Sequence, residues 1–128
     1  MTSTMFRIKR IYDPFDPTDG TRVLVDRLWP RGVTKRNAQI DLWLKEIAPS
    51  PALRAWFAHD PARWTDFQRR YRRELQQQPS AVARLRDLGS LGPLTLIYAA
   101  HDTVHNHARV LAEYLDHLSG EVHVDPAA

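Results

Sequence analysis

The sequence contains no cysteine among its 128 residues. This absence excludes disulfides, thiolate zinc sites and every mechanism with a cysteine nucleophile. Rhodanese-like and tyrosine-phosphatase-like α/β enzymes are therefore excluded, because their chemistry depends on a cysteine.

Long apolar runs are also absent. The longest, at residues 96–100, is far shorter than the roughly 20 residues that span a bilayer, and the N-terminus lacks an apolar signal core. We therefore expect a soluble, cytoplasmic protein without a membrane partner. Its length predicts one domain over residues 1–128, with a core at about 6–118 and a flexible C-terminal tail. The sequence leaves the oligomeric state open.

The charge is mildly basic and is carried mostly by arginine. Lysine and arginine together number 18 against 15 acidic residues, which gives a formal net charge of +3. Fifteen of these 18 are arginine, and the planar guanidinium suits carboxylates and phosphates, so an anionic ligand is favoured. A genome-wide preference for arginine over lysine would produce the same bias.

The order of patterns predicts a small three-layer α/β domain. Its short, mostly parallel sheet has three or four strands and a long helical crossover. The alternation at residues 6–12 is typical of a strand near a sheet edge, and the continuous apolar run at 23–25 is typical of a central strand. Residues 35–88 predict three or four helices, 94–99 a further strand, and 121–124 a short final strand.

An apolar strand passes within a few residues into a helix whose start is rich in histidine, at residues 95–108. Asp102 or Thr103 is the expected N-cap. A helix that begins where a strand ends attracts anions through its free amides and its dipole, so we expect the functional site here. Apolar residues at the spacing of one buried face define this helix: Val104, Ala108, Leu111, Leu115 and Leu118.

Polar residues follow the predicted central strand, in the segment 25–32. Asp26 is the candidate general base, or the residue that orients a histidine. Arg27 and Arg31 are candidates for holding an anion, and Trp29 for a pocket wall. In the alternative interpretation, Asp26 and an arginine form an ion pair that fixes the loop, and Trp29 fills the core.

The histidines of the junction differ in their expected roles. His105 is the predicted catalytic partner of Asp26, and Asn106 and His107 join the ligand-binding residues. His107 lies on the flank of the buried stripe, so a packed, hydrogen-bonded role is the alternative for it. His101 and His105 are four residues apart, which amounts to half of a metal site. We therefore predict neither a metal nor another cofactor.

The segment 63–73 is the strongest basic feature of the chain. It is compatible with contact to a phosphate backbone, and this supports an alternative function in association with nucleic acid. The alternative is an amphipathic helix that places its arginines in solvent. In that case its apolar stripe is Trp64, Phe67, Tyr71 and Leu75.

Three motifs together resemble the YeaO-like family of small bacterial proteins. They lie at residues 25–32, 43–50 and 96–108, and the resemblance covers about residues 6–118. The family is a domain of unknown function, so the resemblance implies no particular activity.

The leading hypothesis is a protein that binds a small anionic or nucleotide-like ligand in a crevice between the 26–31 loop and the helix that carries His105. Whether it also transforms that ligand, and is therefore an enzyme, stays open. The alternatives are association with nucleic acid through residues 63–73, or a structural protein that binds a partner through an exposed apolar patch around Trp56, Phe57 or Trp64.

Overall fold

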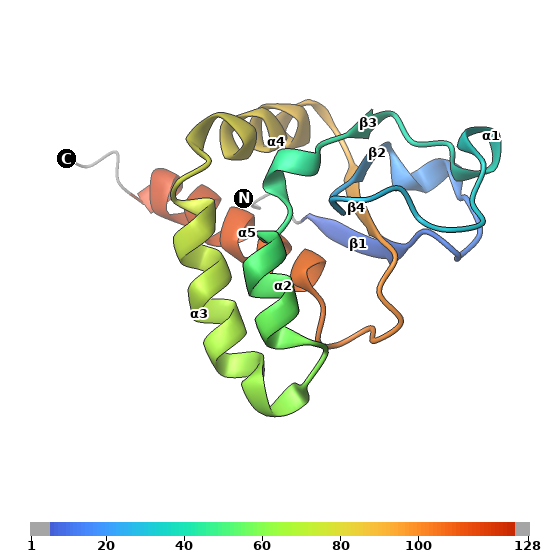
Figure 1. The fold of residues 1–128 in the computed structure, drawn as a ribbon. Coiled ribbons are helices and arrows are strands. Elements are labelled where there is room, and N and C mark those ends of the chain that lie inside the picture. The colour runs from blue at the N-terminus through green and yellow to red at the C-terminus, as the bar shows by residue number, and fades with distance from the viewer. Residues whose placement is uncertain (1–5, 125–128) are drawn as a thin grey trace.

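The fold is built on a four-stranded, all-parallel sheet in the order β1-β4-β2-β3 (Figure 1). The computed structural model describes residues 6–124, with side chains through residue 118. The strands are β1 (Arg7–Arg10), β2 (Thr21–Leu24), β3 (Leu42–Trp43) and β4 (Leu94–Tyr98). The predicted small α/β domain with a parallel sheet is confirmed.

The two inner strands are the two with continuous apolar runs. Every residue of β4 is buried, and Val23, Leu24 and Val25 have no exposed surface. Among the described residues, β1 pairs with β4 alone, so it is the edge strand that its alternating pattern predicts. β3, the other edge, lies within the segment expected to be helical, because two residues are too few to give a period-2 signal.

The crossover from β2 to β4 carries the helices α1 (Lys35–Ala38), α2 (Pro51–Phe57), α3 (Trp64–Leu75) and α4 (Pro79–Leu91). The helices α2 and α4 begin with proline. Proline lacks a backbone N–H, and it is tolerated here because N–H groups in the first turn of a helix have no acceptor within that helix. Short 3₁₀ turns precede α2 and α3. Figure 1 shows α2 and α3 side by side, with α4 above them.

The sheet is covered unequally on its two faces. On one face, α2 to α5 and the strands share a single apolar core that includes Val23, Leu96, Phe67 and Leu111. The opposite face is closed by a smaller cluster from residues 29–43, in which Ala38 of the one-turn α1 is buried. The larger core therefore fixes α5 against the sheet and positions its first turn.

The last helix, α5 (His107–Val124), differs from the expectation at both ends. It continues through residues 121–124, so the predicted final strand there is wrong. Extending an existing helix adds one hydrogen bond for each residue fixed, without the turn that a new strand would need. Its stripe is confirmed at Ala108, Leu111 and Leu115, which are fully buried, whereas Val104 precedes the helix and is exposed.

Candidate functional site

Asp26 lies where β2 ends and contacts both β4 and α5. Its Oδ2 accepts a hydrogen bond of 3.0 Å from the amide of Ala99, and its Oδ1 lies 3.2 Å from Nε2 of His107. The same Nε2 is 3.0 Å from the carbonyl oxygen of Val25. Since a carbonyl oxygen only accepts, Nε2 carries the proton that it donates to Val25. The expected closeness to the junction helix is thus present for Asp26.

His105 belongs to a different pair. Its Nδ1 lies 2.9 Å from Oδ2 of Asp102, and Oδ1 of Asp102 accepts from the amides of Val104 and His105. These hydrogen bonds lower the pKa of Asp102 to about 2, so the carboxylate is ionised at neutral pH. Nδ1 of His105 therefore donates, because an ionised carboxylate only accepts. Asp26 and His105 are not direct partners, and any acid–base role of either one would use its own pair.

Asn106 is the N-cap of α5, so the expectation of Asp102 or Thr103 is wrong. Its Oδ1 accepts from the amide of Arg109 at 3.0 Å, and its Nδ2 donates to the carbonyl of Asp102. The sequence signal was misleading because an aspartate earlier in the segment caps a separate turn just before the helix. Asn106 is 2% exposed, and both Oδ1 and Nδ2 of its side chain are hydrogen-bonded to backbone atoms. Asn106 therefore contributes to the site by fixing the backbone at the start of α5.

A pocket of about 310 Å³ opens beside the start of α5. We call it the His pocket. Its basic and polar walls are Arg54, His59, His105, Asn106 and His107. The remaining walls are apolar and come from the start and end of α2, from α3 and from the segment after β4: Pro49, Pro51, Ala55, Phe57, Phe67 and Ala100.

Sequence reasoning did not assign Arg54 or His59 to the ligand-binding site. They belong to α2 and to the turn after it, far along the chain from both predicted motifs. Their position depends on how α2 packs onto α3, which no local pattern specifies. One sequence signal could have pointed to them: Ser50-Pro51 is typical of a helix start, and Arg54 and His59 follow it closely.

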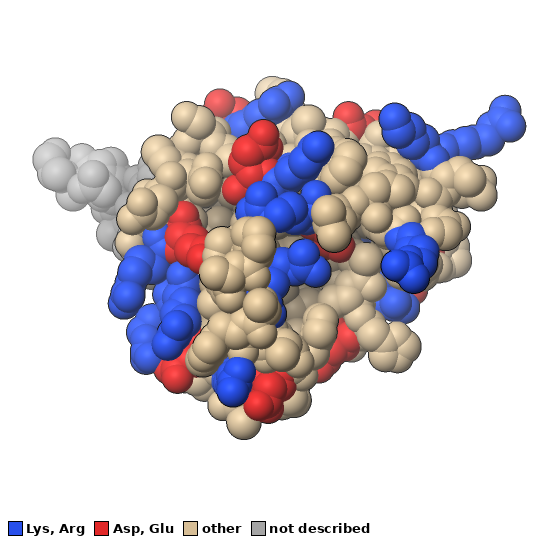
Figure 2. Space-filling view, viewed as in Figure 1, with Lys and Arg blue, Asp and Glu red and all other residues tan. Residues whose placement is uncertain are grey.

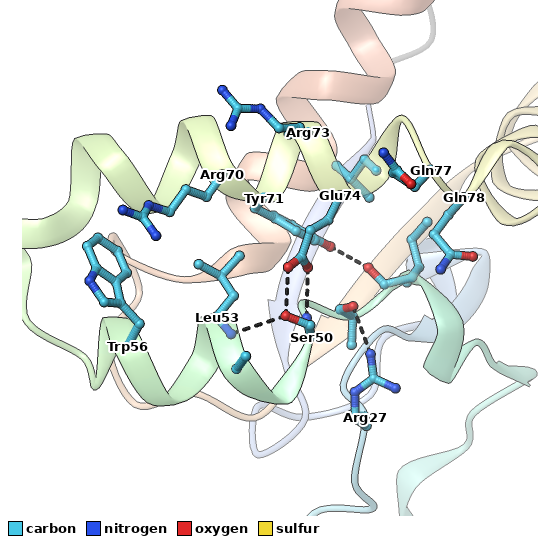
Figure 3. A pocket seen from close by; sticks show the side chains of 14 residues that line it. Arg27, Ser50, Leu53, Trp56, Arg70, Tyr71, Arg73, Glu74, Gln77 and Gln78 are labelled. Carbon is cyan, nitrogen blue, oxygen red and sulfur yellow. Dashed lines mark hydrogen bonds between the residues drawn. The ribbon is translucent and has the colours of Figure 1, made fainter.

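Arg27 lies outside the His pocket. Its guanidinium donates to the carbonyls of Ala48 and Pro49 at 3.2–3.4 Å, so it ties the loop after β2 to the segment before α2. It also lines a second cavity, of about 610 Å³, on the other side of α2 (Figure 3). We call this second cavity the Arg pocket.

Trp29 and Arg31 line neither cavity. The indole N–H of Trp29 donates to the carbonyl of Val33 at 2.6 Å, and its ring packs edge-on against Trp43 in the smaller apolar cluster. Arg31 is exposed, and its backbone carbonyl accepts from Tyr12. The geometry thus matches the alternative interpretation for Trp29, in which it fills the core.

Three of the five arginines in residues 63–73 have acidic partners nearby. Arg69 pairs with Asp66, Arg63 with Asp60, and Arg72 lies 3.8 Å from Glu113. Arg70 lies over the ring of Trp56. Figure 2 shows acidic side chains interspersed among the basic ones on this view of the molecule. This pairing reduces the basis for nucleic-acid binding, which needs unpaired positive charge.

The apolar patch required for the partner-binding alternative is not formed by the predicted residues. Phe57 is buried, and Trp56 and Trp64 are partly buried against the main core. Phe57, Trp64 and Phe67 form one stacked group, with ring centroids 4.4–6.0 Å apart. These aromatic residues therefore serve the interior of the domain.

Among the side chains described, those of residues 6–118, no three or more histidine, aspartate or glutamate residues are grouped so that they could hold a metal ion. In the same part of the chain, no helix is both long and apolar enough to cross a membrane.

Comparison with known proteins gives one family and several relatives. The family described as "Inactive DUF488-N3 subclade" matches residues 5–126. The uncharacterized protein YeaO of Escherichia coli is 46% identical over 110 residues, which are 86% of this chain and 96% of that protein. The uncharacterized proteins Mb3100c of Mycobacterium bovis and Rv3073c of Mycobacterium tuberculosis are each 42% identical over 113 residues, or 88% of this chain and 95% of theirs. No solved structure matches. The resemblance to YeaO-like proteins is thus confirmed, and the chain belongs to the DUF488-N3i family, the inactive DUF488-N3 subclade.

Proposed function

We propose that this protein binds a small monoanionic molecule in the His pocket and does not transform it. The observation that carries the proposal is the convergence of Arg54, His105 and His107 on one concave site beside the N-terminus of α5. A long helix presents positive partial charge at its N-terminus, and this favours an anion there.

The walls of the pocket indicate the chemical class of the ligand. Arg54 is the one wall residue that is charged at every physiological pH, so a single negative charge is the best match. Phe57, Phe67 and Ala100 offer apolar surface to the rest of the molecule. At about 310 Å³ the pocket suits one ring or a short aliphatic chain that carries a carboxylate.

Binding is favoured over catalysis on two grounds. The family description uses the word inactive. In addition, one oxygen of Asp26 is occupied by the amide of Ala99 and Nε2 of His107 by the carbonyl of Val25, so both groups also serve to hold the loop. A general base needs a free lone pair toward its substrate. Nε2 of His105 remains available to the ligand, and it would donate to a carboxylate when it carries a proton.

The test is a titration of isotopically labelled protein with benzoate, followed by NMR. Trp64 is a natural reporter, since its ring packs edge-on against His105 at a centroid distance of 5.2 Å. We expect saturable shifts of the Trp64 indole and of the His105 ring. Arg54→Gln should weaken binding by about tenfold or more, because a hydrogen bond to a charged group contributes roughly 1.5–3 kcal/mol.

Two matched variants serve as controls. Arg36→Gln removes the same charge from α1, which covers the opposite face of the sheet, and His101→Ala removes an exposed histidine that does not line the pocket. Both should bind benzoate as the unmodified protein does. The proposal fails if benzoate causes no saturable shift, or if Arg54→Gln and Arg36→Gln weaken binding equally.

A further inference from the structure

The Arg pocket is a second cavity, about twice the volume of the His pocket. It lies between α2 and α3, above the segment 47–50 (Figure 3). The two cavities share no lining residue, and α2 separates them, since it turns Leu53 and Trp56 to one and Arg54 and Ala55 to the other. The Arg pocket is thus independent of the function proposed above.

The lining of the Arg pocket is electropositive. It includes three arginines, Arg27, Arg70 and Arg73, and one acidic side chain, Glu74, which leaves an excess of two positive charges. The carboxylate of Glu74 is already occupied, because its two oxygens accept from the amide and the hydroxyl of Ser50 at 2.8 and 2.6 Å. The charge that matches this pocket is therefore that of a dianion.

The floor of the pocket has no unsatisfied polar group in its centre. The hydroxyl of the fully buried Tyr71 donates to the carbonyl of Ile47 at 2.6 Å, and Leu53 and Leu75 supply apolar surface. Polar contacts to a ligand are left to the rim, where Figure 3 places Gln77 and Gln78 at one end. The pocket thus combines an apolar floor with a charged and amide-bearing rim.

At the other end, an aromatic ring and a guanidinium lie against each other. The guanidinium of Arg70 lies over the ring of Trp56 at 4.2 Å from the centroid (Figure 3). Nucleobases stack on tryptophan rings and on arginine planes alike. A planar group placed here would continue that stack, while the negative end of the ligand reached toward Arg27 or Arg73.

We propose that the Arg pocket binds a phosphomonoester dianion with a planar group, of the size of a nucleoside monophosphate. The negative charge pairs with the arginines, and the planar group lies on the Trp56–Arg70 stack. The volume of about 610 Å³ is sufficient for a molecule of this size.

The experiment measures calorimetric affinities for adenosine monophosphate, adenosine and inorganic phosphate. We expect adenosine monophosphate to bind at least about tenfold more tightly than either fragment, because only it uses both ends of the pocket. Its binding should shift the Trp56 indole in NMR spectra and leave the Trp64 indole unchanged. Benzoate should do the reverse, so failure of one site does not imply failure of the other.

The decisive comparison uses two double variants of one helix. Arg70→Gln/Arg73→Gln removes the charges that line the pocket, and Arg69→Gln/Arg72→Gln removes the same number that lie outside it and pair with Asp66 and Glu113. The first pair should weaken binding at least about tenfold, and the second less than about threefold. Equal losses in both, or no binding of adenosine monophosphate by the unmodified protein, would overturn the proposal. Circular dichroism of each variant confirms that it is folded.

Discussion

Nε2 of His107 lies 3.2 Å from Oδ1 of Asp26, and this contact joins the loop after β2 to the first turn of α5. The side chains are only 14% and 17% exposed, so the contact is largely shielded from water. Together with the hydrogen bond from Ala99 to Asp26, it holds the ends of the two central strands and the start of α5 as one unit. The wall of the His pocket therefore depends on a residue that does not itself line the pocket.

We predict that Asp26→Asn destabilises the fold by about 1–3 kcal/mol, the usual cost of leaving a buried polar group unpaired. If the amide oxygen keeps the hydrogen bond from Ala99, the amide NH₂ must face the protonated Nε2 of His107, which is a donor against a donor. Urea denaturation measures the loss. Asp13→Asn, at an exposed position, is the control, and equal stabilities of the two variants would contradict this role of Asp26.

The fold was largely predictable because its signals are local and strong. The apolar run at 23–25 belongs to a central strand that is buried on both faces, and the alternating sequence of β1 belongs to an edge strand. The strand predicted at 121–124 failed for a physical reason, because the β-branched Val122 and Val124 favour strands on average but here continue a helix that is already formed.

The site was predictable only in part. The sequence placed Asp26 close to the junction helix, because both follow central parallel strands at one edge of the sheet. It did not place Arg54 or separate Arg27 from the histidines, since both depend on the packing of α2. The partner of each histidine also depends on where α5 begins. The helix begins at residue 107 and not near residue 103 as expected, and this difference changes which side chains face the sheet.

Asn106→Ala should cost about 1 kcal/mol of stability, the usual value for loss of a helix N-cap. Its Oδ1 is the acceptor for the amide of Arg109, and alanine offers none. Asn106→Asp keeps the acceptor and should recover most of the loss. Thr103→Ala should change the stability by less than about 0.5 kcal/mol, since Thr103 is exposed and lies before the cap. Thermal unfolding compares the stabilities of the three variants. A greater loss of stability in Thr103→Ala than in Asn106→Ala would place the N-cap of α5 at residue 103 instead.

The stability of the protein should fall in acid partly through Asp102. Hydrogen bonds from the amides of His105 and Val104 lower the pKa of its carboxyl from the ordinary 3.8 to about 2. A carboxyl with a depressed pKa in the folded state contributes stability above its unfolded pKa, and this contribution is lost as the pH falls from about 4 to about 2. Asp102→Asn should therefore show a smaller decline over this range. Carbon NMR of the side-chain carboxyl reads the midpoint directly, and a value near 3.8 would refute the assignment.

At the other end of the pH scale, the buried Tyr71 should make the fold sensitive to alkali. Burial raises the pKa of its phenol well above 10, with the nearby Glu74 and Asp26 adding to the shift. The unfolded chain releases the proton at about 10 while the folded chain keeps it, so the free energy of unfolding falls as the pH rises above about 10. Tyr71→Phe should reduce this slope, and Tyr98, whose pKa burial also raises, should account for what remains. At neutral pH Tyr71→Phe should also be less stable by about 1–2 kcal/mol, because the carbonyl of Ile47 loses its donor.

Tyr12→Phe is the matched control for this prediction, because Tyr12 is 50% exposed and its hydroxyl also donates to a backbone carbonyl, that of Arg31. Urea denaturation at pH 7 and at several values between 9.5 and 11 gives both quantities for each variant. Tyr12→Phe should keep the alkaline slope of the unmodified protein, because Tyr12 lies outside the buried core. If both variants keep that slope, the alkaline sensitivity comes from another group and the role of Tyr71 is refuted.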